Sequence, residues 1–483
     1  MYLGLDLGTS GLKGLLISEN QELIGSAEIS YGVENFATGW SEQNPEDWIK
    51  ACESVMNSLS SRFSSQVSAL RGIGISGQMH GATLLDKDGE VIRSCILWND
   101  TRSFDQAQKM DDNGVFREVS GNIVFPGFTA PKISWIKEHE PNNFKKIAKV
   151  LLPKDYLRFW LTGDLISEMS DASGTSWLDL KNRYWSEQLI NLSGLNVEQM
   201  PKLIEGSEVG GLLKRKFKQQ WNILGDVVVV GGAGDNAAAA CGCGVMSEGQ
   251  GFVSLGTSGV LLAARDGCFP SPETAVHTFC HAVPHKWYQM GVILAATDSL
   301  NWLSKISGKM PAELASLVPE EPNGPTKLKF APYLAGERTP HNDSITRGAF
   351  IGLDIGHDNS ILTQAVFEGV AFALKENLSA LKKTGAKIEK LYALGGGVQS
   401  NFWLRTIANI LNLTVLLPKK GELGAALGAA RLALIAGEGA SPEEIITEPS
   451  VDKVIEPNSR LEAVYDDAYQ VFKKIYPSIK ELK

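Results

Sequence analysis

Short apolar runs that end in glycine-rich turns set the hydrophobic pattern of the first half of the chain. Residues 2–5 and 226–230 are two such runs, and the second holds four consecutive valines. β-Branched residues in an unbroken run predict a strand covered on both faces. Residues 45–59 instead form an amphipathic pattern that predicts a helix, and Asn44-Pro45 supplies its start signal. Further strands are expected over residues 21–30, 71–76 and 84–89, the last of which runs into a turn.

The second half of the chain repeats this alternation of strands and helices. Residues 360–382 carry Val366, Val370 and Leu374 on one stripe, which predicts a long helix. Residues 423–435 are rich in glycine and alanine, which predicts a helix that packs very close to a neighbouring element. The remaining elements expected are a strand over 391–394, a helix over 402–411 and a helix over the last 25 or so residues.

One pentapeptide occurs twice. Leu7-Gly8-Thr9-Ser10-Gly11 recurs letter for letter at residues 255–259, and each copy lies between two apolar, strand-like runs. A Gly/Thr/Ser turn between such runs predicts a β-hairpin. Because the copies open the two halves of the chain, we interpret them as the mark of a duplicated α/β domain plan.

Composition narrows the class of protein. At 483 residues the chain exceeds what one core usually organises, so two domains are expected. The net charge of −9, without a basic tract, argues against a nucleic-acid partner. The six cysteines are scattered, which does not indicate a disulfide framework. Neither a signal peptide nor an 18-residue apolar stretch occurs, so we expect a cytoplasmic protein with no membrane contact.

The first copy of the repeat follows a carboxylate. Asp6 ends the first apolar run, and Thr9, Ser10 and Lys13 follow it. Glycines let backbone N–H groups converge on a phosphate, and hydroxyls donate to its oxygens. Lys13 adds positive charge, and Asp6 can hold Mg²⁺ directly or through water. The alternative is a plain hairpin turn in which Asp6 bonds its own loop.

A second carboxylate follows the valine-rich run. Asp235 and Asn236 come directly after Gly231-Gly232-Ala233-Gly234. This places them at the carboxyl end of a strand, where open α/β sheets bind ligands. Asp235 can accept a proton from a substrate hydroxyl, and Asn236 can hydrogen-bond a neighbouring hydroxyl. The alternative is that Asp235 caps the following helix.

A third group of residues has the composition of a pocket for a polyol, which needs hydrogen-bonding groups and an apolar wall. The hydrogen-bonding candidates are His80, Asn99, Asp100 and Arg102, and the apolar ones are Met79 and Trp98. The alternative for His80 is a structural histidine that bonds within the fold.

The fourth motif is a run of three glycines, Gly395-Gly396-Gly397, where a strand is expected to turn into a helix. Exposed backbone of this kind can lie flat against an adenine or a ribose. Ser400 or Asn401 then bonds the base edge. An ordinary tight turn is the alternative.

Together these motifs resemble the FGGY family of carbohydrate kinases over essentially the whole chain. The matching segments are Asp6-x-Gly8-Thr9-Ser10, residues 127–138, Gly234-Asp235-Asn236, Gly256-Thr257 and residues 395–397. Other segments resemble bacterial xylulokinases in particular; they are residues 78–82, 97–100, 152–156, 170–172 and 336–341.

The resemblance implies a fold and an assignment of roles. It implies two ribonuclease-H-like domains of the actin and hexokinase type, with the active site in the cleft between them. Residues 1–245 would form the sugar side and 246–483 the nucleotide side. The last 25 or so residues can fold back on either domain, and packing on the first domain is one of the two options. The implied roles are metal binding by Asp6, phosphate contacts by Thr9, Gly256 and Thr257, sugar contacts by Met79, His80, Asp235 and Asn236, and nucleotide contacts by Asp298, Gly396, Gly397 and Ser400. Because related kinases often carry Asn where Ser400 stands, the base contact can shift to Asn401.

The reaction expected from this resemblance is transfer of the γ-phosphoryl group of ATP, with Mg²⁺, to a terminal hydroxyl of D-xylulose. The family also suggests a homodimer. Two alternatives stay open: a kinase for another sugar or polyol, such as ribulose, a hexonate or glycerol, and a non-kinase nucleotide-binding protein with an actin-like fold.

Overall fold

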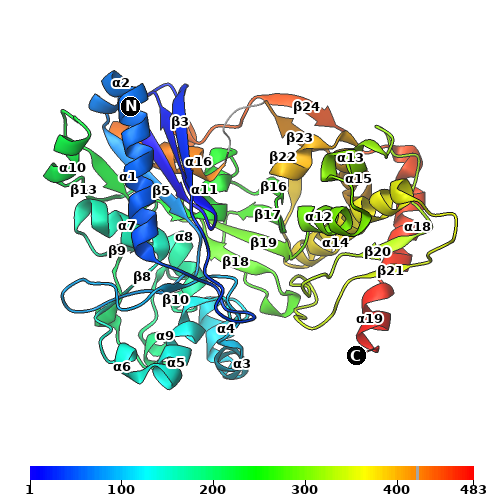
Figure 1. Cartoon of the computed structure of the whole chain (residues 1–483), viewed down its shortest axis with the longest axis horizontal. Helices are drawn as coiled ribbons and strands as arrows, with labels where there is room; N and C mark the ends of the chain where they lie inside the picture. The colour runs from blue at the N-terminus through cyan, green and yellow to red at the C-terminus, as the bar shows by residue number, and fades with distance from the viewer. Residues whose placement is uncertain (420–423, 483) are drawn as a thin grey trace.

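Two seven-stranded mixed sheets form the framework of the protein in a computed structural model that describes residues 1–419 and 424–482. They lie side by side in the two halves of the molecule (Figure 1). The strands of the first sheet are, in spatial order, β13 (Val209–Leu212), β14 (Val228–Val230), β5 (Gly72–Gly77), β1 (Tyr2–Leu7), β2 (Gly11–Ile17) and β3 (Leu23–Ser30), with β15 (Ala233–Gly234) also beside β5. The strands of the second sheet are β18 (His277–Cys280), β19 (Trp287–Ile293), β17 (Gly259–Arg265), β16 (Gly249–Leu255), β22 (Ile388–Leu394), β23 (Val415–Pro418) and β24 (Val451–Ile455).

The two sheets share one topology, which confirms the duplication predicted from the repeated pentapeptide. In the first sheet, β1 pairs with β2 in antiparallel and with β5 in parallel orientation. In the second, β16 pairs with β17 in antiparallel and with β22 in parallel orientation. Each pentapeptide forms the turn of its hairpin, as its glycines and hydroxyl residues predict. The valine-rich run is β14, whose Val229 and Val230 are fully buried.

Helices cover both sheets, and small subsheets extend the first half. The main helices are α1 (Pro45–Arg62), α2 (Ser64–Ser68), α11 (Asp235–Gly242), α12 (Thr297–Ser307), α13 (Pro311–Ser316), α14 (Asn359–Lys383), α15 (Asn401–Leu411), α16 (Ala425–Glu438), α17 (Pro442–Ile445), α18 (Glu462–Phe472) and α19 (Ile475–Lys480). The extension contains β6 (Thr83–Leu85), β8 (Lys149–Leu151), β9 (Ile166–Glu168), β10 (Leu178–Asp179), β11 (Tyr184–Trp185) and β12 (Lys202–Ile204), with α3 (Phe104–Asp112), α4 (Val115–Ser120), α5 (Thr129–His139), α6 (Pro141–Phe144), α7 (Pro153–Thr162), α8 (Met169–Ala172), α9 (Glu187–Leu192) and α10 (Arg215–Gln220). Two further two-stranded sheets are present. β4 (Glu42–Gln43) pairs with β7 (Cys95–Ile96), and β20 (Lys329–Ala331) pairs with β21 (Ala349–Ile351).

The two halves exchange one helix each. α16 lies in sequence between β23 and β24 of the second sheet but packs on β1 and β5 of the first sheet. α11 follows the first sheet, and its apolar side chains join a core cluster with Phe252, Leu262 and Tyr288 of the second. The two helices also cross each other closely, because a Cβ at Gly428 would lie 1.8 Å from the carbonyl oxygen of Ala238. The close packing predicted for this glycine- and alanine-rich helix is confirmed; residue 423 of that prediction lies outside the described residues.

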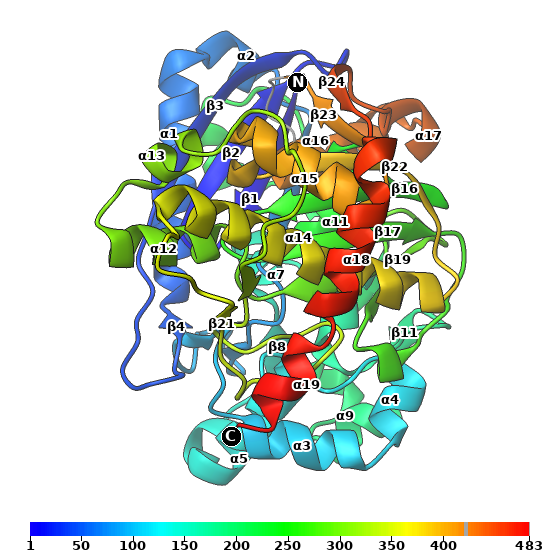
Figure 2. The ribbon, with the colours of Figure 1, turned by 90° about the vertical axis from the view of Figure 1, so that its right-hand side faces the viewer.

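The end of the chain corrects one expectation. α18 packs against α14 and α15, and its Tyr465, Tyr469 and Phe472 join the core cluster of the second half. Figure 2 shows α18 in front of these helices. Of the two domains left open for this segment by the sequence, packing on the first is therefore wrong, and the segment packs on the second. The reason is physical: its apolar stripe meets the apolar faces of α14 and α15, a partner that periodicity alone does not reveal. None of the helices among the described residues is long and apolar enough to cross a membrane.

Candidate active site at the carboxyl edges of the two sheets

Three of the predicted motifs leave the first sheet at one edge. β1, β5 and β15 run parallel, and Asp6 on β1 is in register with Ser76 on β5, which in turn faces Ala233 on β15. Asp6 and the turn before Asp235 are thus two strand spacings apart, roughly 10 Å between backbones. His80 follows β5 at the same edge. Strand pairing alone therefore brings these motifs together.

Asp6 is held by its neighbour on β5. The Ser76 hydroxyl donates to Asp6 Oδ1 at 2.7 Å. Burial raises the pKa of Asp6, opposed by this hydrogen bond and by the charge of Lys13, which faces Asp6 across the hairpin. Tyr31 holds the hairpin loop that follows Asp6, since its hydroxyl donates to the carbonyl oxygens of Gly8 and Gly11. The loop that carries Ser10 is exposed, as a phosphate site requires.

Thr9 connects the predicted phosphate loop, residues 8–11, to residues predicted to lie on the sugar side. Its hydroxyl donates to Gln78 Oε1 at 3.1 Å and accepts from the indole N–H of Trp98 at 3.0 Å. Gln43 completes the network by donating to the Thr9 carbonyl oxygen at 2.7 Å and accepting from Gln78 at 2.8 Å. Gln43 is buried in the structure, but sequence reasoning missed it because nothing in its local pattern distinguishes it from a surface glutamine.

Asp235 is the first residue of α11, and the cap position belongs to Gly234. The backbone N–H and side-chain amide of Asn236 both donate to Asp235 Oδ1, at 2.7 and 2.9 Å. Within the described residues, Oδ2 receives no hydrogen bond and is open to a substrate proton. Burial raises the pKa of Asp235 to about 6 despite the bonds from Asn236, and the charge of Asp6 contributes to the rise. The carboxyl is therefore a base of the strength that general-base catalysis near neutral pH requires.

Two buried side chains anchor the glycine-rich turn that precedes Asp235. Arg158 Nη1 donates to the Gly231 carbonyl oxygen at 2.9 Å, and Ser170 Oγ accepts from the Gly234 N–H at 3.0 Å. Ser170 is oriented in turn by Glu168, to which its hydroxyl donates at 2.9 Å. Together with the backbone hydrogen bonds of Gly231 and Gly232 to Glu208 and Gly206, these contacts fix the conformationally free glycine turn and so the direction of the carboxylate that follows it. Sequence reasoning did not assign this role to either residue.

His80 has a conformation and a tautomer set by its surroundings. Its φ is +69°, its ring stacks on Phe128 at 4.5 Å, and Nδ1 lies 2.7 Å from the Gly174 carbonyl oxygen. Nδ1 therefore carries the proton and Nε2 is the acceptor. Burial lowers the pKa of His80 to about 3, so the ring is neutral at physiological pH. Met79 beside it is buried and packs against Gly234 and Tyr288. The site roles of His80 and Met79 stay predictions.

The next three predicted sugar-side residues fall into two environments. Trp98 and Asn99 are exposed, and the indole of Trp98 already reaches the phosphate loop. Asp100 is fully buried instead: its carboxylate accepts from the backbone N–H of Ser41 at 2.6 Å and pairs with Arg102 at 2.7 Å. Asp100 thus holds the loop that presents Trp98, and its oxygens are occupied by the fold. Trp98 and Asn99 face solvent beside it, and their contacts to a sugar stay predictions.

The second hairpin loop is backed by the start of α12. The N–H groups of Ala296 and Thr297 donate to the carbonyl oxygens of Thr257 and Gly256, at 2.8 and 2.9 Å. This arrangement leaves the hydroxyl of Thr257 exposed at the carboxyl end of β16. Asp298 also lies at this edge, exposed, with its N–H 3.3 Å from the Thr257 carbonyl oxygen.

The triple glycine, residues 395–397, packs closely against Leu255, which directly precedes the Gly256-Thr257 loop. Gly395 has φ +89°, and a Cβ there would lie 2.7 Å from the carbonyl oxygen of Leu255. A Cβ at Gly397 would lie 2.7 Å from the Leu255 side chain. Glycine is required here by close approach to β16 and by the left-handed backbone. The triple glycine and Gly256-Thr257 therefore leave neighbouring parallel strands at one edge of the second sheet, as β16 and β22 are paired to Ser254 and Leu394.

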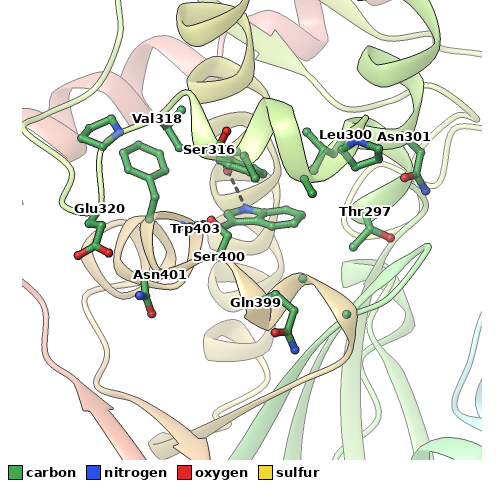
Figure 3. A pocket seen from close by; sticks show the side chains of 18 residues that line it. Thr297, Leu300, Asn301, Ser316, Val318, Glu320, Gln399, Ser400, Asn401 and Trp403 are labelled. Atoms are coloured by element: carbon green, nitrogen blue, oxygen red, sulfur yellow. Dashed lines mark hydrogen bonds between the residues drawn. The ribbon is translucent and has the colours of Figure 1, made fainter. Parts of the chain in front are cut away.

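A cavity of about 750 Å³ lies beside the triple glycine. Figure 3 shows Trp403, Ser400 and Gln399 on one side of it and Thr297, Leu300 and Ser316 on the other. Its apolar walls and few polar groups suit a flat heterocycle. Predicted residues that line it are Gly396, Gly397, Ser400 and Asn401; lining residues that sequence reasoning missed include Asn301, Ser316, Glu320 and Gln399.

Ser400 and Asn401 are partly engaged within the fold. The Ser400 hydroxyl accepts from the backbone N–H of Trp403 at 3.2 Å and so caps α15. Asn401 Oδ1 accepts from Lys453 at 3.2 Å, which leaves its amide N–H groups for a ligand. Each side chain therefore keeps hydrogen-bonding capacity toward the cavity, and the choice between them for a base contact stays open.

Two duplicated α/β sheets with loops that face each other define the actin/hexokinase-type class of fold. The chain belongs to the FGGY family of carbohydrate kinases. The model of the family's N-terminal domain matches residues 1–242 and that of its C-terminal domain matches residues 251–437. The predicted fold class and family are confirmed.

Several known proteins are similar over their full length. The chain is 42% identical to a xylulose kinase of Klebsiella pneumoniae and 40% identical to one of Escherichia coli K12, with 100% of each chain covered. A crystal structure of a xyloylose kinase from Brucella ovis matches with a TM-score of 0.98 and 53% identity, again over 100% of both chains. A gluconate kinase from Lactobacillus acidophilus matches with a TM-score of 0.91 and 27% identity, over 99% of this chain and 97% of that one.

Proposed function

We propose that this protein transfers the γ-phosphoryl group of ATP to O5 of D-xylulose. The observation that carries the proposal is the position of Asp235, a half-buried carboxyl of raised pKa that leaves the first sheet at the same edge as the exposed loop carrying Ser10. The full-length similarity to proteins named xylulose kinase supports the choice of sugar. The proposed homodimer and the division of the chain at residues 245 and 246 stay predictions.

In the proposed mechanism, Asp235 is the general base. Its free Oδ2 takes the proton of the terminal hydroxyl as the new bond to phosphorus forms, while Asn236 holds Oδ1 in place. Met79 and the Nε2 acceptor of His80 bind the remainder of the sugar. Phosphoryl transfer depends on alignment and charge neutralisation more than on covalent catalysis, and these residues provide the alignment. A positioned base contributes about 10²–10⁴-fold.

The nucleotide is proposed to lie across both sheets. The cavity lined by Gly396, Gly397 and Trp403 takes the adenine, and the two hairpin loops donate N–H and hydroxyl groups to the phosphates. Thr9, Ser10 and Lys13 act from the first sheet, and Gly256 and Thr257 from the second. The cavity's volume and its lining of apolar and hydrogen-bonding side chains support an adenine ligand.

Asp6 fits the proposed Mg²⁺ site. Its carboxyl stands at the strand edge beside the phosphate loop, with Oδ1 oriented by Ser76. The described residues contain no group of three or more His, Cys, Asp or Glu side chains arranged to hold a metal ion. This agrees with Mg²⁺ bound by one carboxylate plus phosphate oxygens and water, as is usual for that ion. When bound, Mg²⁺ would neutralise charge on the phosphate oxygens.

The pH dependence of turnover follows from the environment of Asp235. Because burial raises the pKa of this base to about 6, its ionised form is lost as pH falls through 6. We expect kcat/KM for the sugar to fall about tenfold per pH unit below that value. His80, with a pKa of about 3, stays neutral throughout this range and does not contribute to the fall. Stopped assays between pH 4.5 and 8 measure the profile, and a flat profile would contradict the assignment.

A substrate panel tests the proposed function. ADP formation is measured with D-xylulose, D-ribulose, L-ribulose, gluconate and glycerol, each with and without Mg²⁺. We expect D-xylulose to give the highest kcat/KM and the product to be the 5-phosphate by NMR. Preference for gluconate would identify a kinase for another sugar, an alternative that the gluconate kinase likeness favours. ATP hydrolysis that no sugar changes would instead support a non-kinase actin-like protein.

A further inference from the structure

The segment Gly336–His341 connects the second sheet to the sugar side of the first. Thr339 makes two hydrogen bonds to Val292 at the end of β19. Its backbone N–H donates to the Val292 carbonyl oxygen at 3.0 Å, and its hydroxyl accepts from the Val292 N–H at 3.1 Å. Glu337 Oε1 accepts from the Leu294 N–H at 3.1 Å. The chain after Leu294 is the one that backs the Gly256-Thr257 loop. The segment is therefore rigidly attached to the nucleotide half.

Arg338 extends from this segment into the other half of the molecule. Its guanidinium lies over the ring of Phe125, 4.1 Å from the centroid. Phe125 packs edge-on against Phe128, and the ring of Phe128 in turn stacks on that of His80. After burial, which is the main cause, the charge of Arg338 also lowers the pKa of His80 and of His277. The cation thus faces the predicted sugar-side histidine across a short aromatic row.

The guanidinium has no acceptor in the described part of the chain. Neither a hydrogen bond nor an ion pair reaches it from residues 1–419 or 424–482, apart from its packing on Phe125. Glu337, the adjacent acid, directs Oε1 at the backbone N–H groups of Leu294 and Arg338 instead. Burial lowers the pKa of Arg338 to about 10, partly offset by the charge of Glu337. The guanidinium is half-buried, so its donors remain accessible and can be directed at a ligand oxygen.

We propose that Arg338 binds the C1–C2 end of the sugar, donating to the carbonyl oxygen of the open-chain ketose and an adjacent hydroxyl. The inference rests on the proposed sugar kinase function and deepens it by adding a contact from the nucleotide half. Arg338 lies at the Phe125 end of the aromatic row that leads to His80, whereas Asp235 is the first residue of α11. We assign the two groups to opposite ends of the substrate. Asp235 is at O5, and Arg338 is at the carbonyl. A guanidinium fork matches the planar geometry of a carbonyl oxygen.

Replacement of Arg338 tests the proposal. Arg338→Met keeps an unbranched apolar stem against Phe125 and removes the donors. We expect KM for D-xylulose to rise about 10–100-fold, the range for a lost hydrogen bond to a charged group, with KM for ATP within about twofold of wild type. The matched control is Arg347→Met in the same connection, because Arg347 is exposed and donates only to backbone oxygens of residues 344–346. Equal sugar KM values in wild type and Arg338→Met would overturn the proposal.

A second measurement uses the wild-type protein and does not depend on the folding of a variant. Phenylglyoxal modifies arginines, and mass spectrometry follows the rates at Arg338 and Arg347. We expect D-xylulose to protect Arg338 and leave Arg347 unchanged. Modification of Arg338 at one rate with and without saturating sugar would overturn the proposal. Wild-type turnover of D-xylulose tests the proposed function separately, so its failure is distinguishable from a failure at Arg338.

Discussion

Replacing Asp235 with Asn should lower kcat for D-xylulose phosphorylation by at least about 10²–10⁴-fold, the contribution of a positioned general base. The amide keeps the shape of the carboxyl and can still accept at Oδ1 from Asn236. It cannot take the hydroxyl proton. Sugar binding should change little, because the proton moves only as the bond to phosphorus forms. Steady-state kinetics with coupled ADP detection measures kcat, and titration calorimetry measures sugar affinity.

Asp226→Asn provides the matched control for this variant. It makes the same change nine residues earlier in the chain, at a fully exposed carboxylate that pairs with Lys218. We expect wild-type kcat from it. Asp235→Asn should also lose the acid limb of the pH profile that the raised pKa of Asp235 produces. If Asp235→Asn turns over at the wild-type rate, the role assigned to Asp235 is wrong.

Most of the fold was predictable from local pattern. Strands such as 226–230 and helices such as 45–59 and 360–382 matched β14, α1 and α14 because their periodicity and start signals are contained in the segment itself. The repeated pentapeptide identified the duplicated topology, since two hairpin turns of one sequence impose one strand order. Motifs at the ends of parallel strands were also predictable as a group, because strand pairing gathers them without any side-chain contact.

Contacts between residues that are far apart in the sequence were not predictable in this way. Arg338 lies more than 200 residues from the Phe125 ring that positions it, and Ser170 lies 64 residues from the Gly234 N–H that it accepts. Neither has a local pattern that distinguishes it from an ordinary polar residue. The exchange of α16 onto the first sheet has the same origin: its small residues predicted a close neighbour but contain no information about which one.

Gly74→Ala is expected to destabilise the protein severely, because β5 and α16 meet there backbone to backbone. A Cβ at Gly74 would lie 1.8 Å from the carbonyl oxygen of Ala429 and 2.6 Å from its carbonyl carbon. No rotamer relieves this contact, so α16 must move away from the first sheet. Overpacking of a core costs about 1–3 kcal/mol and sometimes more, and a backbone obstacle places Gly74→Ala at about 3 kcal/mol or above. Thermal unfolding followed by circular dichroism measures the loss.

Gly32→Ala is the control for that measurement, because Gly32 is exposed and a Cβ there has no atom within 4 Å. We expect its melting temperature to equal that of wild type within error. Any folded Gly74→Ala protein should also lose activity, since β5 leads directly into Met79 and His80 and pairs with the turn before Asp235. A Gly74→Ala protein with wild-type stability would show that α16 does not depend on this contact to hold the two halves together.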